Sequence, residues 1–309
     1  MFEPVNSWVE KLDCSVCNAN GVELAILRED KIHPSISGNK WRKLKYNLQA
    51  AKNQGHGTLL TFGGAFSNHI AAVAEAGELF GFKTIGVIRG EQHEELNPTL
   101  EIASRKGMQF VYVDRDAYRN KSDDTFLADL KTKLGEFYLI PEGGSNSFGV
   151  QGCEEILHEQ TLAYDYICCA MGTGATLAGI ILSASDQQRV MGFPALKNGD
   201  FLKQDVEGFL NGIQKANWGL ETDYHFGGYA KVAPELIAFM NEFYLAHKIP
   251  LDPIYTGKMM FGIMDLIAKG HFAKGSKILS VHTGGLQGIK GINQRLLQQG
   301  IRISYEETA

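Results

Sequence analysis

From residue 40 onward, short runs of β-branched and aromatic residues alternate with longer amphipathic stretches. This alternation is typical of strand–helix units that build a parallel sheet. The first series predicts strands at 58–62, 83–88, 109–113 and 137–140 and helices at 67–80, 97–106 and 122–134. Each of these helices begins at a residue whose side chain can cap the first turn. We expect these segments to form one compact four-stranded unit.

A second series follows, with predicted strands at 166–170, 189–193 and 277–281 and predicted helices at 173–185, 234–246 and 257–269. We expect it to form another sheet. The chain contains no internal repeat, low-complexity tract or linker rich in proline and serine that would mark a domain boundary. The pattern alone therefore places the boundaries near residues 47 and 150.

The composition fits a globular chain of two domains, with 309 residues, 44% hydrophobic and 21% charged. The 30 basic and 35 acidic side chains give a net charge of -5, so no basic excess points to nucleic acid or to an anionic membrane. A small-molecule partner fits better. No run of about 18 apolar residues occurs, and no positive segment leads into an apolar run at the start, so we expect a cytoplasmic protein.

The chain has five cysteines, an odd number scattered along its length, which argues against a disulfide framework. Cys14 and Cys17 have the spacing of a metal-ligand pair, but no second pair and no paired histidines complete a tetrahedral site. We therefore interpret that spacing as coincidental. The sequence predicts reduced thiols and no metal centre.

Lys40 opens a predicted helix and is followed closely by Arg42, Lys43 and Lys45. The positive end of the helix dipole and these neighbouring cations all oppose another ammonium group at this position. Such surroundings favour a neutral amine, which Schiff-base formation with an aldehyde cofactor requires. The alternative is an ordinary solvated basic face, and on this segment alone that alternative is preferred.

Two turns between a predicted strand and a predicted helix carry further candidates. Ser67, Asn68 and His69 place a hydroxyl, an amide and an imidazole beside free backbone N–H groups, which suits a carboxylate. The alternative is that Ser67 or Asn68 merely caps the helix. The second turn, residues 172–176, brings two glycines and two hydroxyls to a helix N-terminus and has the chemistry of a phosphate cradle. A tight turn without a ligand is the alternative there.

Nucleotide binding has little support, because residues 172–176 match neither the dinucleotide glycine pattern nor the Walker pattern. Tyr229 and Tyr255 each lie next to a predicted turn, where a phenol can act as acid, base or hydrogen-bond orienter. Most tyrosines, however, are packing residues. Thr283 follows the last predicted strand, at the sheet edge where ligands of open α/β sheets bind.

Five segments, taken in order, resemble the motifs of the aminocyclopropanecarboxylate deaminase and D-cysteine desulfhydrase family. They are Gly38-Asn-Lys-Trp-Arg-Lys-Leu, Gly64-Ala-Phe-Ser-Asn-His, Gly172-Thr-Gly-Ala-Thr, Asp252-Pro-Ile-Tyr-Thr-Gly-Lys and His282-Thr-Gly-Gly. The resemblance spans nearly the whole chain, and five ordered motifs are far more specific than one. They reverse the preference for a plain basic face at Lys40.

The resemblance implies the tryptophan-synthase-β-like α/β fold of pyridoxal-phosphate enzymes (fold type II), with open, mostly parallel sheets flanked by helices. Residues 1–46 and 151–309 would form the large cofactor-binding domain, and residues 47–150 the small inserted domain. Relatives of this kind commonly form homodimers, so we expect a homodimer here.

By the matching positions, Lys40 would hold pyridoxal 5'-phosphate as a Schiff base and remove the substrate α-proton. Ser67, Asn68 and His69 would bind the substrate carboxylate, and Asn68 would also hold the phenolic oxygen of the cofactor. The cofactor phosphate would rest on Gly172, Thr173, Gly174, Ala175 and Thr176. Ser67 joins Lys40 as a candidate catalytic residue.

Tyr255, with Tyr229 behind it, would line the face where protons are transferred. In family members that open the cyclopropane ring, the position of Thr256 is usually glutamate and that of Thr283 is usually leucine. A carboxylate keeps the pyridine nitrogen protonated better than a hydroxyl does, so the two threonines match the desulfhydrase branch. The resemblance therefore favours elimination from D-cysteine to pyruvate, ammonia and sulfide.

Other functions stay open. The nearest alternative is the deaminase reaction, which gives 2-oxobutyrate and ammonia from 1-aminocyclopropane-1-carboxylate. A different class would be a non-catalytic carrier or sensor that binds pyridoxal phosphate. Ile70-Ala-Ala stands where the family usually continues with Arg-Gln, which leaves the orientation of the substrate open. Trp41 replaces a residue that is commonly small, and the chain is somewhat short for the family, so another D-amino acid or β-substituted alanine stays open as the substrate.

Overall fold

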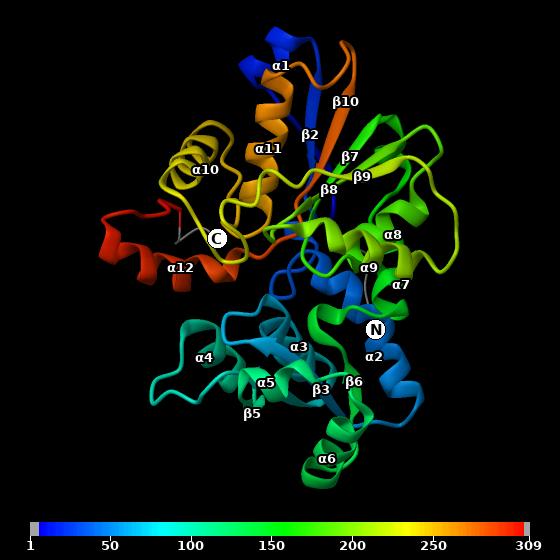
Figure 1. Ribbon diagram of the computed structural model, residues 1–309, viewed down its shortest axis with the longest axis vertical. Helices are drawn as coiled ribbons and strands as arrows, with labels where there is room; N and C mark the ends of the chain where they lie inside the picture. The colour runs from blue at the N-terminus through cyan, green and yellow to red at the C-terminus, as the bar shows by residue number, and fades with distance from the viewer. Residues whose placement is uncertain (1–5, 306–309) are drawn as a thin grey trace.

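The computed structural model describes residues 6–305, and two open sheets form the centre of the fold (Figure 1). The larger sheet has the order β1-β2-β10-β7-β8-β9. Its neighbouring strands run parallel except β1 and β2, which are antiparallel. The strands are β1 (Val9–Leu12), β2 (Glu23–Leu27), β10 (Lys277–Val281), β7 (Tyr166–Met171), β8 (Arg189–Pro194) and β9 (Trp218–Leu220).

The smaller sheet has the order β5-β4-β3-β6 and is parallel throughout. Its strands are β3 (Thr58–Gly64), β4 (Lys83–Arg89), β5 (Gln109–Val113) and β6 (Tyr138–Ile140). All four strands predicted from the first series are present, and they form one unit as expected. The three strands predicted from the second series lie together in the larger sheet, so the α/β class with mostly parallel sheets is confirmed.

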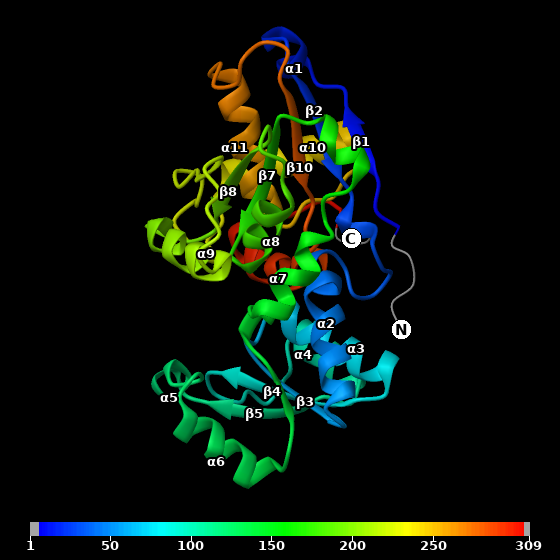
Figure 2. The same cartoon turned by 90° about the vertical axis from the view of Figure 1, so that its right-hand side faces the viewer.

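Helices cover both faces of both sheets, as Figure 2 shows from the side. In the larger sheet, α10 and α11 pack on one face and α7, α8 and α9 on the other. In the smaller sheet, α2, α3 and α4 pack on one face and α5 and α6 on the other. The helices are α1 (Ser15–Asn20), α2 (Asn39–Asn53), α3 (Asn68–Phe80), α4 (Pro98–Arg105), α5 (Arg115–Arg119), α6 (Asp124–Leu134), α7 (Ser147–Glu154), α8 (Ala175–Ser183), α9 (Leu202–Leu210), α10 (Pro234–His247), α11 (Thr256–Ala268) and α12 (Ile289–Leu296).

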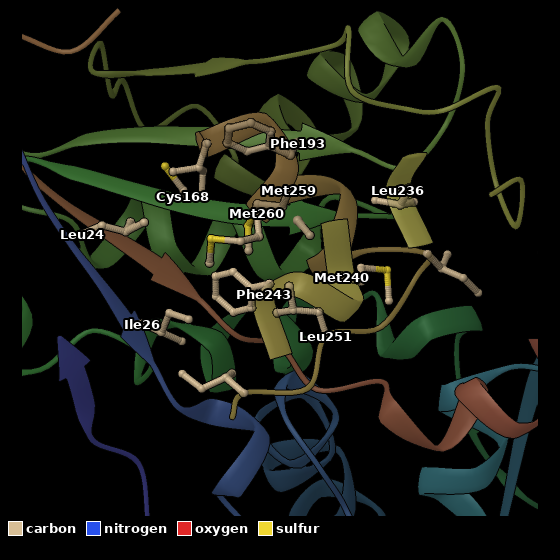
Figure 3. Packing of buried hydrophobic residues seen from close by; sticks show 14 of the residues in the cluster. Leu24, Ile26, Cys168, Phe193, Leu236, Met240, Phe243, Leu251, Met259 and Met260 are labelled. Atoms are coloured by element: carbon tan, nitrogen blue, oxygen red, sulfur yellow. The ribbon is translucent and has the colours of Figure 1, made fainter. Parts of the chain in front are cut away.

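The strand period of two explains why each central strand reads as an unbroken apolar run. Along β2, Leu24 and Ile26 point into the cluster under α10 and α11, whereas Ala25 and Leu27 point to the opposite face. Figure 3 shows the first of these clusters, in which Met240 and Phe243 of α10 and Met259 and Met260 of α11 lie on one side of Leu24, Ile26 and Cys168. A strand buried on both faces needs apolar residues at every position, so the alternation typical of exposed strands is absent.

Helices α2 and α7 lie where the two sheets meet (Figure 2). Their close packing is evident at Gly152 of α7, where a Cβ would come within 1.9 Å of the carbonyl oxygen of Arg42 in α2. The expected domain limits near residues 47 and 150 fall inside these two helices. The division into two domains stays a prediction.

The thiols of Cys14 and Cys17 correct one expectation. The two residues form a disulfide, with their Cα atoms 5.4 Å apart, so the prediction of reduced thiols is wrong for this pair. Cys14 is the N-cap of α1, and Cys17 lies three residues later on the same side of its first turn. A helical turn thus brings together two sulfurs whose spacing had been interpreted as coincidental. The remaining cysteines, Cys153, Cys168 and Cys169, are free and buried.

The lengths and compositions of the helices also bear on a membrane role. Within residues 6–305, no helix combines the length and the apolar character that crossing a membrane requires.

Candidate active site

The first turn of α2 is pressed against the end of β10. Gly38 has a φ of 65°, and a Cβ at this position would stand 1.9 Å from the carbonyl oxygen of Thr283. The same oxygen accepts a hydrogen bond from the Asn39 N–H at 3.2 Å. Only glycine allows so close an approach of two backbones. The contact fixes Lys40 beside the carboxyl edge of the larger sheet, where ligands of such sheets bind.

Lys40 lines a cavity, and its Nζ donates a hydrogen bond to Asn39 Oδ1 at 3.2 Å. The pKa of Lys40 is lowered to about 7, chiefly by burial and also by the nearby ammonium group of Lys43. The sequence predicted a neutral amine from the helix dipole and the neighbouring cations. The direction is the same, but burial is the largest cause. A large fraction of this amine is therefore neutral near pH 7.

The turn between β7 and α8 lines the same cavity. Gly172, Thr173, Gly174 and Thr176 lie on its wall, whereas the neighbouring Ala175 is fully buried and is not part of it. Gly174 adopts a left-handed conformation immediately before the helix. The free N–H groups at a helix N-terminus are a ready-made site for an anion such as a phosphate.

Tyr255 packs against this turn. Its phenol oxygen lies 3.2 Å from the point that a Cβ on Gly172 would occupy, and it lines the cavity. The ring of Tyr229 meets it edge-to-face, with the centroids 6.2 Å apart. Burial raises the pKa of Tyr255 well above its ordinary range, and burial also raises the pKa of Tyr229. Both phenols therefore carry their protons at neutral pH and can donate them in hydrogen bonds.

The Ser67 turn lies where this cavity adjoins a larger open cleft of about 1240 Å³, to which Ser67 and Tyr229 both contribute. Ser67 Oγ accepts hydrogen bonds from the N–H groups of His69 and Ile70, so the capping interpretation is correct for its present contacts. Asn68 lines the cavity. His69 is only 2% exposed and is not part of either wall, and burial holds its pKa well below the usual value.

The two threonines differ in position. Thr283 lines the cavity and is 8% exposed, whereas Thr256 is fully buried and is not part of the cavity wall. The hydroxyl of Thr256 accepts a hydrogen bond from the Asp252 N–H and donates one to Asp252 Oδ2, both at 2.8 Å. Asp252 also accepts from the N–H groups at the start of α11. The hydroxyl proton of Thr256 is therefore already committed to a carboxylate.

Lys43 is a cavity residue that sequence reasoning did not single out. It is 2% exposed, and its Nζ donates to the carbonyl oxygen of Gly143 at 3.1 Å. The signal was present, because Lys43 lies three residues after Lys40 and so faces the same side of α2. Its charge makes it a candidate for contact with an anionic group. Further cavity residues that were not predicted are Ser37, Asn39, Gly143, Ala170, Met171, Leu177, Gly284, Gly285 and Gln287.

Comparison with known proteins identifies the family. The model of the family described as pyridoxal-phosphate dependent enzyme matches residues 15–284. The chain belongs to this family. A putative 1-aminocyclopropane-1-carboxylate deaminase of Pyrococcus horikoshii is 31% identical, over 90% of this chain and 89% of the relative. A bifunctional mitochondrial D-cysteine desulfhydrase/1-aminocyclopropane-1-carboxylate deaminase of Arabidopsis thaliana is also 31% identical, over 87% of this chain and 74% of the relative.

A solved structure agrees with these relatives. The crystal structure of an ACC deaminase homologue superposes with a TM-score of 0.82 at 29% identity and covers 96% of this chain and 95% of that chain. The resemblance drawn from the five motifs and the fold type that it implied are confirmed. The protein is an enzyme, and its cofactor is pyridoxal 5'-phosphate.

The residues of the cavity fit this cofactor. An aldehyde needs a neutral amine, and the buried amine of Lys40 meets that requirement. A phosphate needs N–H donors or cations, and the start of α8 and the ammonium group of Lys43 supply both. All of these groups line one cavity.

Proposed function

We propose that this enzyme eliminates the β-substituent of D-cysteine or of a similar D-amino acid. With D-cysteine and one water molecule, the products are pyruvate, ammonium and hydrogen sulfide. The observation that carries the proposal is the shared cavity, in which the amine of Lys40, the phenol of Tyr255 and the Gly172 turn lie together. These are a base, an acid and an anion site.

The cofactor contacts that we propose follow the family resemblance, and most of the residues line the cavity. Lys40 would be the covalent anchor, and Asn68 would hold the phenolic oxygen. The turn 172–176, with Lys43, would bind the phosphate, and Thr283, with Thr256 behind the wall, would lie at the ring nitrogen. When bound, pyridoxal phosphate withdraws electrons from the substrate α-carbon and so makes its proton acidic.

Side chains of the protein would bind the substrate and transfer the protons. The Ser67 hydroxyl, the Asn68 amide and the start of α3 would bind the substrate carboxylate, with His69 behind them. The neutral Nζ of Lys40 would take the α-proton. The phenol oxygen of Tyr255, supported by Tyr229, would donate a proton to the departing sulfur.

The choice between elimination and ring opening depends on the electron sink. A hydroxyl holds a proton at the ring nitrogen less firmly than a carboxylate does, and the hydroxyl of Thr256 has already given its hydrogen bond to Asp252. A weak sink is sufficient for removing an α-proton when the leaving group is as good as hydrosulfide. The deaminase reaction remains the second candidate, because relatives carry that name.

The test is a product assay on the holoenzyme. D-cysteine should release sulfide and pyruvate in equal amounts, and Lys40→Ala should release neither. Faster formation of 2-oxobutyrate from 1-aminocyclopropane-1-carboxylate would favour the deaminase instead. A yellow protein that turns over no amino acid in a panel would be a carrier or sensor, and the proposal would be rejected.

Two broader expectations are part of the same proposal. The family resemblance supports a homodimer, which light scattering on the holoenzyme would test. The lack of a long apolar segment supports a cytoplasmic location, which fractionation of cells would test.

A further inference from the structure

The loop that carries Tyr229 has an unusual backbone. Phe226 and Ala230 have φ values of 50° and 56°, and Gly227 and Gly228 have 89° and 115°. Residues other than glycine rarely adopt this left-handed conformation, because the Cβ then crowds the following carbonyl oxygen. Such a backbone persists only where its surroundings hold it. Contacts from other parts of the chain must therefore hold the loop in the conformation that positions Tyr229.

One buried ammonium group contacts the middle of this loop. Lys258 is 2% exposed, and its Nζ donates hydrogen bonds to the carbonyl oxygens of His225 and Gly228, both at 2.8 Å. Each of these oxygens also closes a turn: His225 accepts from the Gly228 N–H at 3.0 Å, and Gly228 accepts from the Lys231 N–H at 3.1 Å. Lys258 thus ties together two consecutive turns, 225–228 and 228–231, and the second of them contains Tyr229.

The position of Lys258 along the chain connects the loop to the second tyrosine. Lys258 lies in the first turn of α11, three residues after Tyr255. The same short segment therefore presents Tyr255 to the cavity and anchors the loop that presents Tyr229. Their rings meet edge-to-face as a result.

Two other contacts hold the edges of the loop. Phe226 packs edge-to-face on Phe261, with centroids 4.9 Å apart, and Arg295 donates to the carbonyl oxygen of Ala230 at 2.8 Å. Neither contact involves the carbonyl group of His225 or that of Gly228. Burying a charged amine has a large desolvation cost, and burial lowers the pKa of Lys258 to about 8. A methionine of similar length would fill the same space without that cost.

We propose that Lys258 is a positioning residue that holds Tyr229 against Tyr255 for proton transfer. This inference rests on the proposed function, because it takes the two phenols as the groups that handle the proton. Lys258 lines neither the cavity nor the cleft, so it acts through Tyr229 alone. Its loss should therefore lower kcat and leave KM nearly unchanged.

The test is a double-mutant cycle on the holoenzyme with Lys258→Met and Tyr229→Phe, assayed with D-cysteine. We expect Tyr229→Phe to lower kcat by about 100-fold and Lys258→Met to lower it by about tenfold. In the double variant, Lys258→Met should lower kcat by less than about a further twofold, because the Tyr229 hydroxyl that Lys258 positions is already absent. The matched control is Lys269→Met, at the C-cap of the same helix, which removes an exposed ammonium group paired with Asp265 and should leave kcat unchanged.

A second measurement does not depend on turnover. Hydrogen exchange of the peptide that spans residues 225–231 should be at least about tenfold faster in Lys258→Met than in the wild type and in Lys269→Met. Unchanged exchange, or losses in kcat that multiply in the double variant, would overturn the inference. Should Lys258→Met fail to fold, Lys258→Gln keeps an N–H donor and takes its place. Failure of both variants to fold, beside a well-folded Tyr229→Phe, would make Lys258 purely structural.

The outcomes separate this inference from the proposed function. If the wild type does not act on any β-substituted amino acid, the proposed function fails, while the exchange measurement still reports on the anchoring of the loop. If Tyr229→Phe lowers kcat but Lys258→Met affects neither kcat nor exchange, only the role of Lys258 is lost.

Discussion

Replacing Gly38 with alanine tests whether the approach of α2 to β10 sets the position of the active amine. The alanine Cβ would stand 1.9 Å from the carbonyl oxygen of Thr283 and 2.3 Å from its carbon. To restore even a 3.0 Å contact, the two backbones must separate by about 1.1 Å. Lys40 follows two residues later on the same rigid turn, so it must shift with the backbone.

The cost has two parts. Gly38 has a φ of 65° and a ψ of -146°, a conformation open almost only to glycine, and forcing alanine into it costs about 1–3 kcal/mol. The steric clash adds about 1–3 kcal/mol. Together these are a large fraction of the roughly 5–15 kcal/mol that stabilises a typical protein. A misplacement of about 1 Å at a reacting group can lower a rate by about 100-fold.

We therefore expect Gly38→Ala to fold with a lower melting temperature and to lose about 100-fold in kcat/KM for D-cysteine. The control is Gly55→Ala, just beyond the other end of α2, where φ is 74° but nothing lies within 4 Å of the added carbon. Gly55→Ala also places a Cβ at a positive φ but lacks the clash, so its activity should stay close to wild type. Equal activity of the two variants would refute the reasoning, because the close approach would then have no effect on the amine.

Three further predictions concern the same site and the disulfide. Lys40→Ala should abolish covalent trapping of the cofactor by borohydride, which mass spectrometry of the reduced protein measures; a trapped cofactor on another lysine would contradict the role of Lys40. Because burial lowers the pKa of Lys40 to about 7 from its usual 10.5, the unfolded chain binds more protons than the folded apoenzyme between these values. The free energy of unfolding of the apoenzyme, relative to Lys40→Met, should therefore rise with pH across this window, and a constant difference in urea titrations would oppose it. Denatured protein kept without reductant should expose three titratable thiols and reduced protein five, since Cys14 and Cys17 are paired; five thiols in both samples would rule out the disulfide.

The alternation of strand and helix patterns was sufficient to predict the smaller sheet, because each of its strands is apolar and ends at a turn. The pattern did not reveal β1, β2 or β9. The four residues of β1 include a glutamate and a lysine at the sheet edge, and the three residues of β9 include a glycine, so neither carries a clear strand signal. The short apolar run of β2 lies between β1, the strand just before it in the chain, and β10, which comes from the distant C-terminal part. Local sequence contains little of that information.

The site was accessible to sequence reasoning as a set of motifs and not as a geometry. Gly38 and Thr283 are far apart in the chain, yet their backbones touch. The partner of the Thr256 hydroxyl was equally hidden, because a carboxylate four residues earlier can cap a helix or face solvent with the same sequence. The burial of Lys40 was hidden from the sequence in the same way. The sequence indicated a depressed pKa from neighbouring charges, but the largest cause is desolvation, which appears only once the chain is folded.

The distribution of charge on α2 explains why two of its cations are available for chemistry. Arg42 forms an ion pair with Glu29 at 2.9 Å, and Lys45 forms one with Glu155 at 2.6 Å, so the charges of these two residues are neutralised. Within residues 6–305, neither Lys40 nor Lys43 makes an ion pair; they donate to an amide oxygen and a backbone carbonyl oxygen instead. Two close ammonium groups that form no ion pair repel each other, and the free energy is lowest when one of them is neutral. The phosphate of the cofactor would supply an anionic partner for Lys43, and the aldehyde would react with the neutral amine of Lys40, so the two ends of the cofactor match the two states that the apoenzyme favours.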